Sequence, residues 1–118
     1  MPAGLSTHVL DTMHGCAAQG MKVELWRIEG EDRELVTTAR TNADGRTEQP
    51  LLAPDEIKPG QYELVFFVGD YFAQKSAALP KIRFLDKVPV RFGIADGSTR
   101  YHVPLLCSPW AYSTYRGT

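Results

Sequence analysis

Histidine and arginine are the residues of this chain best suited to chemistry on a small polar molecule. His8 and His102 each lie in a run of alternating residues, and His14 lies in a Met-His-Gly turn. Histidine titrates near pH 6.5, so it can activate a water or protonate a leaving group. Arg46 follows a turn sequence at 42–45, and its guanidinium offers a planar set of donors for carbonyl or enolate oxygens. If the fold brings these side chains together, they contain the parts for attack by water on a carbonyl group.

Each of these residues also has an ordinary structural explanation when it is taken alone. His8 and His102 then face solvent or form a hydrogen bond within a sheet, Arg46 is solvated at the start of a strand, and His14 is exposed in its turn. Converging histidines could hold zinc, but no His-x-His or Cys-x-x-Cys spacing supports a metal site, so we expect none. No phosphate-binding loop or Gly-x-Ser-x-Gly elbow is present, and no serine or cysteine has a context that marks a nucleophile.

The elements that must position these residues are mainly strands. Alternation places Leu5, Thr7 and Val9 on one face of a first strand, with Ser6 and His8 on the other. Turn residues follow each alternating run at short intervals. The pattern predicts strands over 5–11, 22–29, 34–41, 61–68, 88–94, 101–106 and 111–115. About seven or eight short strands of this kind are typical of an all-β sandwich of two antiparallel sheets.

The remaining segments are predicted to be irregular or helical. Residues 50–60 hold three prolines and form a loop, and residues 77–84 are interrupted by Pro80. Residues 70–76 are predicted to form one short helix with Asp70 as its N-cap. Pro89 and Pro104 lie within predicted strands, and because proline cannot donate to a sheet, these strands are expected at edges or with bulges.

Length and composition favour one globular domain over residues 1–118. The net charge of -1 leaves no basic footprint for nucleic acid or anionic lipid. The longest apolar run is the five residues 64–68, whereas a membrane span needs about 20. No signal peptide is evident, and the two cysteines, Cys16 and Cys107, are expected to be free thiols, so we expect a cytoplasmic protein.

Four segments together resemble one known family. They are LSTHVLD at 5–11, TNADGR at 41–46, YHVPLL at 101–106 followed by SPW at 108–110, and YSTYRGT at 112–118. In this order and spacing they closely resemble the 5-hydroxyisourate hydrolases, also called transthyretin-like proteins. The resemblance covers essentially the whole chain, and it is the set of four, rather than any one segment, that is specific.

The resemblance implies a fold, an assembly and a reaction. The fold is a transthyretin-like sandwich of eight strands, assembled as a homotetramer, a dimer of dimers, with the sites in a channel between dimers. The reaction hydrolyses 5-hydroxyisourate to 2-oxo-4-hydroxy-4-carboxy-5-ureidoimidazoline, the second step of urate breakdown in purine metabolism. No metal and no organic cofactor is required.

The family's functional positions map onto His8, Arg46, His102 and the tetrapeptide 115–118. The resemblance implies catalytic roles for the first three and for Thr118, which stands where the family usually has serine. It implies substrate binding by His8, Arg46, Tyr115, Arg116 and Gly117. Arg116 could equally anchor the tail, and neither histidine is marked as the one that activates the water. Residues 77–82 lack an expected Phe-Tyr-Pro, which we interpret as loop variation.

Two other function classes compete with the enzyme. Vertebrate transthyretin shares the fold and carries thyroid hormone, but it lacks the His, Arg, His and Tyr-Arg-Gly constellation present here. A structural interaction module would leave all four segments unexplained. The site residues, rather than the fold, therefore favour the hydrolase.

Overall fold

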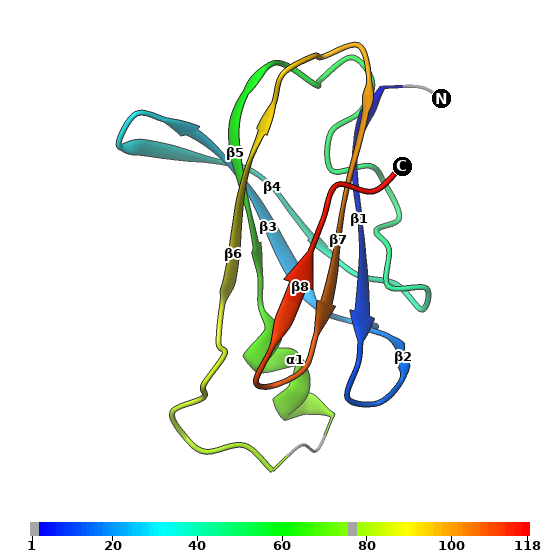
Figure 1. Ribbon diagram of the computed structural model, residues 1–118, viewed down its shortest axis with the longest axis vertical. Helices are drawn as coiled ribbons and strands as arrows, with labels where there is room; N and C mark the ends of the chain where they lie inside the picture. The colour runs from blue at the N-terminus through cyan, green and yellow to red at the C-terminus, as the bar shows by residue number, and fades with distance from the viewer. Residues whose placement is uncertain (1–2, 76–77) are drawn as a thin grey trace.

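Two four-stranded sheets packed face to face make up the protein (Figure 1). The computed structural model describes residues 3–75 and 78–118. The first sheet has the order β2 (Cys16–Ala17), β1 (Gly4–Asp11), β7 (Arg100–Cys107) and β8 (Tyr112–Thr114). The second has the order β4 (Asp32–Arg40), β3 (Lys22–Glu29), β5 (Gly60–Phe66) and β6 (Val88–Ile94). The predicted all-β sandwich of about eight strands is confirmed, but the prediction of two antiparallel sheets was wrong for the first sheet, in which β1 and β7 are parallel.

The alternating pattern of β1 separates an inner face from an outer face, as predicted. Leu5, Thr7 and Val9 are buried between the sheets, whereas Ser6 and His8 are only half-buried. The inner face belongs to one continuous hydrophobic core to which both sheets contribute. A fully buried aliphatic side chain in such a core stabilises the fold by about 1.5–3 kcal/mol. The core therefore determines that the outer face of β1, with Ser6 and His8, is the one available for contacts outside the core.

Strand direction decides what lies beside His8 on that outer face. Alternation alone does not give direction, and β1 and β7 are parallel, whereas the other paired strands are antiparallel. The register pairs Ser6 with His102 and His8 with Pro104. Because paired residues present their side chains on the same face of a sheet, Ser6, His8 and His102 share the outer face of the first sheet.

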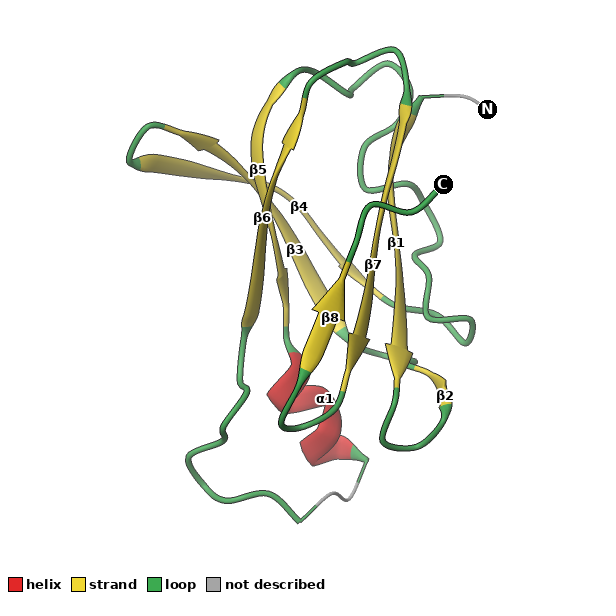
Figure 2. Cartoon of the chain, viewed as in Figure 1, coloured by secondary structure: helices red, strands yellow, loops and turns green. Residues whose placement is uncertain are grey.

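The one described helix, α1 (Val68–Gln74), starts earlier than the sequence suggested. Phe67 occupies the N-cap position with no side-chain cap, so the prediction of Asp70 as N-cap was wrong. Asp70 lies in the first turn and pairs instead with Arg83. Burial of Tyr71 and Phe72 against the end of the sandwich, rather than a cap, fixes the position of this helix (Figure 2). No helix in the described part of the chain is long and apolar enough to cross a membrane.

The two prolines within strands lie in different places. Pro89 is in β6, an edge strand, as predicted. The prediction for Pro104 was wrong, because β7 lies between β1 and β8. The carbonyl of Pro104 accepts the Thr114 hydroxyl at 2.7 Å, so this side of Pro104 faces the last residue of β8. The β7–β8 register ends at the pair Leu105 and Thr114, so the missing N–H of Pro104 lies just beyond it.

Short or irregular segments complete the fold. The two-residue β2 was not predicted, because two residues show no alternation. Residues 78–84 contain no helix or strand, as predicted, whereas positions 76 and 77 of the predicted segments lie outside the described residues. The β3–β4 hairpin projects from the sandwich beyond the neighbouring strands (Figure 1).

Candidate functional site

His102 is held on the outer face of the first sheet by its neighbour on β1. The residue is 9% exposed, and its Nδ1 lies 2.7 Å from the Ser6 hydroxyl. Most of the imidazole ring is buried, and a small part of it remains accessible to solvent. His102 is therefore a hydrogen-bonded sheet histidine that also borders solvent.

The C-terminal segment lies against the same histidine. After β8 the chain continues in the same direction alongside β7 (Figure 1), and the Gly117 N–H donates to the His102 carbonyl at 2.7 Å. A Cβ added at Gly117 would lie 2.6 Å from Cδ2 of the His102 ring, closer than such atoms approach. Glycine at this position therefore lets the tail contact the ring of His102 directly.

Arg46 reaches the same region because its turn is fastened to β1. The Asn42 side-chain oxygen accepts the N–H groups of Asp44, at 2.9 Å, and Arg46, at 3.2 Å. Gly45, with φ of +76°, packs against β1, and its carbonyl accepts the Val9 N–H at 2.8 Å. Because Val9 follows His8 in sequence, this bond holds the turn next to His8. Arg46 follows the turn, and its side chain is exposed.

Burial, together with the positive groups around it, lowers the pKa of His102. Burial lowers the pKa of His102 below its ordinary 6.5, and the nearby charges of Arg100, Arg46 and His8 lower it further. The imidazole is therefore neutral at neutral pH. A neutral ring beside two guanidinium groups can exchange a proton with a reactant while the arginines attract negative charge.

The rest of the tail faces a different hollow. Tyr115 and Arg116 line a space of about 370 Å³ between β6 and β7, with Tyr101 at its wall. The Arg116 guanidinium lies 4.1 Å from the Tyr101 ring centre and donates to the Arg100 carbonyl at 3.4 Å. These two contacts hold the Arg116 side chain against β7. Thr118 is exposed.

The predicted residues thus fall into two groups. His8, His102 and Arg46 lie around one outer face with Gly117, whereas Tyr115 and Arg116 line the hollow beside β6. The sequence reasoning did not single out Ser6 or Arg100. The only signal for Ser6 was its place on the same strand face as His8, and for Arg100 its position two residues before His102.

Comparison with known proteins assigns the chain to a family. The sequence profile of the HIUase/Transthyretin family matches residues 5–117. This chain belongs to the HIUase/Transthyretin family. It is 54% identical to the 5-hydroxyisourate hydrolase of Pseudomonas aeruginosa, over 97% of this chain and 90% of that protein.

Two solved structures resemble this family member over nearly its whole length. A crystal structure of (S)-allantoin synthase has a TM-score of 0.91 and 47% identity, covering 98% of this chain. The match spans only 44% of that longer chain. Sea bream transthyretin in complex with thyroxine has a TM-score of 0.86 at 21% identity, covering 98% of this chain and 96% of the other, and this likeness shows the fold alone.

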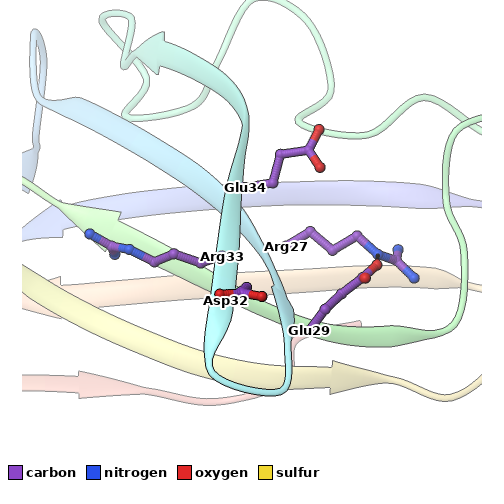
Figure 3. A pocket seen from close by; sticks show the side chains of 5 residues that line it. All are labelled: Arg27, Glu29, Asp32, Arg33 and Glu34. Carbon is purple, nitrogen blue, oxygen red and sulfur yellow. Dashed lines mark hydrogen bonds and ion pairs between the residues drawn. The ribbon is translucent and has the colours of Figure 1, made fainter.

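A charged hollow at the β3–β4 hairpin is a weaker candidate site in this HIUase/Transthyretin chain. Figure 3 shows Arg27 beside Glu29 on one side of the hairpin and Arg33 pointing away on the other. Arg27 Nε lies 3.1 Å from Glu29, and Arg33 lies 3.3 Å from Glu63. Because these arginines already have carboxylate partners, they offer little free positive charge to an anionic ligand.

The third histidine, His14, lies at the surface and forms a hydrogen bond with a buried carboxylate. The Asp11 carboxylate accepts His14 Nδ1 at 2.7 Å and the Tyr71 hydroxyl at 2.8 Å. His14 itself is exposed, as predicted. Within residues 3–75 and 78–118, no three His, Cys, Asp or Glu side chains are grouped closely enough to hold a metal.

Proposed function

We propose that this chain hydrolyses 5-hydroxyisourate to 2-oxo-4-hydroxy-4-carboxy-5-ureidoimidazoline. The observation that carries the proposal is the outer face of the first sheet, where His8 and Arg46 lie near the neutral imidazole of His102. A relative with 54% identity over nearly the whole chain bears the name 5-hydroxyisourate hydrolase. The residue types and the name of this relative support the same reaction.

The geometry suits a ring amide opened by water. The substrate is a small, planar, polar ring, and Arg46 can bind its carbonyl or enolate oxygens through a planar set of donors. One histidine removes a proton from water, and the other donates a hydrogen bond to the attacked carbonyl oxygen. The proton taken from water then passes to the nitrogen that leaves. The positive groups around His102 oppose the negative charge that develops on the attacked carbonyl oxygen. These residues supply each part of the reaction without a covalent nucleophile.

An ultraviolet assay with freshly prepared 5-hydroxyisourate tests the proposal directly. The purified chain should accelerate the decay of the substrate well above the rate in buffer. A decay rate equal to that in buffer, measured with folded protein, contradicts the enzyme. Binding of thyroxine by the same sample would then favour the carrier.

The carrier is the second candidate, and one observation counts against it. A site for an apolar hormone needs a largely aliphatic lining, whereas this face presents two histidines within reach of two arginines. Thyroxine binding belongs to a neighbour with 21% identity, which is informative about fold only. The enzyme is therefore the better explanation of the residues.

The same proposal includes a homotetramer built as a dimer of dimers. The proposed catalytic face is the outer face of the first sheet, which carries His8 and His102. Beside these histidines it also carries the half-buried Leu10 and Leu106. A second copy laid over this face would cover the leucines and give the substrate a second wall. Cys16 and Cys107 are free, and a cytoplasmic location, where thiols stay reduced, remains part of the proposal.

A further inference from the structure

Ser6 has a contact that none of the site assignments explains. It lies 96 residues from His102 in sequence, and the β1–β7 register places the two side by side. Among the side chains that the structure describes, Ser6 alone forms a hydrogen bond with the His102 ring. The distance of 2.7 Å between Oγ and Nδ1 is that of a well-formed bond.

We propose that Ser6 is a positioning residue that donates its hydroxyl proton to Nδ1 of His102 and holds the ring with its own proton on Nε2. This inference rests on the proposed hydrolysis and assigns the two histidines within it. His102 then enters the reaction as the donor to the reacting amide, and His8 is the base that activates the water.

The direction of the hydrogen bond follows from what each group can offer. A neutral imidazole has one N–H and one acceptor nitrogen, and a serine hydroxyl has one proton to donate. In the described part of the chain, Ser6 Oγ has Nδ1 of His102 as its single hydrogen-bond partner. Arg46 and Arg100, which lie near the ring, are donors only. Donation from Ser6 to Nδ1 uses the proton of the hydroxyl and leaves Nε2 as the N–H.

A neutral donor at this position has a clear chemical use. Burial and the neighbouring cations hold the pKa of His102 down, so the ring stays neutral and offers its N–H without carrying a charge. A neutral histidine can stabilise a developing oxyanion in this way while it keeps its own proton, and the proton that His8 takes from water then passes to the amide nitrogen as it leaves. His8 forms no ring hydrogen bond with another described side chain, so a ring nitrogen can accept a proton from water.

The tautomer can be measured without substrate. We would label the full chain with ¹⁵N-histidine and record long-range ¹H–¹⁵N spectra near neutral pH, assigning His102 with a His102→Asn variant. The expected spectrum has the proton on Nε2 and an unprotonated Nδ1, and Ser6→Ala should give a mixture of both tautomers. A proton on Nδ1 of the unaltered protein overturns the inference, whether or not Ser6→Ala folds.

Kinetics provide the second part of the test. Ser6→Ala should lower kcat about tenfold with KM within about threefold, the scale of losing a group that orients a histidine. Ser6→Thr, which keeps the hydroxyl, should restore kcat. Ser113→Ala is the matched control. Ser113 lies on β8, where it pairs with Leu106 of β7, and it forms no described hydrogen bond with His102.

Each kinetic outcome bears on the inference. An unchanged kcat in Ser6→Ala, or no rescue by Ser6→Thr in folded protein, contradicts the positioning role. Loss of all activity together with a covalent adduct at Ser6 in the unaltered enzyme would make Ser6 the nucleophile and also contradict it. Failure of the unaltered chain to hydrolyse 5-hydroxyisourate would refute the proposed function alone, because the tautomer of His102 is measured without substrate.

Discussion

At the scale of single residues, the three histidines separate by their surroundings. His8 and His102 share the outer face of the first sheet, whereas His14 bonds to a buried carboxylate. We expect His8→Ala and His102→Ala each to lower kcat/KM by about two to four decades, the scale of acid–base catalysis. His14→Ala, measured in the same assay, should change it little. A fully active His102→Ala enzyme would remove His102 from the mechanism.

The charges around His102 lead to a prediction about pH. Burial and the neighbouring charges, chiefly those of Arg100 and Arg46, lower its pKa, so its neutral form persists below pH 6.5. The part of the kcat/KM profile that reports protonation of His102 should therefore lie below pH 6.5. Removing a positive neighbour makes the imidazolium easier to form, so Arg100→Gln should move that part of the profile to higher pH. Arg40→Gln, a change at an exposed arginine of β4, serves as the control, and equal profiles for the two variants would contradict this reasoning.

At the scale of elements, the parallel pairing of β1 and β7 builds the catalytic face. The alternation of β1 could be predicted from sequence, because burial follows a local period of two. The contact between Ser6 and His102 could not, because it depends on the direction and register of strands far apart in the chain. The start of α1 was missed for a related reason, since burial of Tyr71 and Phe72 overrides the local capping signal.

The end of β1 is tied to α1 by a buried carboxylate, and this tie should contribute stability. Burial alone would raise the pKa of Asp11, but hydrogen bonds from His14 and Tyr71 outweigh it and lower that pKa below 3.8. Tyr71→Phe keeps the ring and removes one donor to the buried charge. It should lower the free energy of unfolding by about 1–3 kcal/mol near neutral pH.

Urea titration at two pH values checks this contribution. Because the pKa of Asp11 is lower in the folded state, its stabilising effect is present above the ordinary carboxyl range and is lost as pH falls through the folded pKa. The destabilisation by Tyr71→Phe should therefore shrink in acid, while kcat/KM near neutral pH stays unchanged. Tyr112→Phe, at an exposed tyrosine of β8, is the control. Equal midpoints for Tyr71→Phe and the unaltered chain would exclude the tie.

At the scale of the whole molecule, the C-terminal segment lies against the proposed site without belonging to the core. Gly117 contacts the His102 ring, and Arg116 stacks on Tyr101. Removal of residues 115–118 should therefore abolish most activity while the melting temperature stays nearly unchanged, because these residues bury little apolar surface. Normal turnover by the truncated chain would show that the tail is not needed.

Thr118→Ser should preserve or raise activity, since it keeps the hydroxyl and removes a methyl group.

The open catalytic face leads to the last prediction, which concerns assembly. Leu106 lies on the same face as His102, and Leu10 pairs with it on β1, so a partner that covers the histidines must also cover these leucines. Light scattering should report about four chains, the closed symmetry expected for a dimer of dimers. Leu106→Glu places a charge in that contact and should yield smaller species with lower kcat/KM. Leu35→Glu, at an exposed position on β4 of the other sheet, is the matched control and should remain assembled and active. A monomer with full activity would mean that one chain forms the complete site by itself.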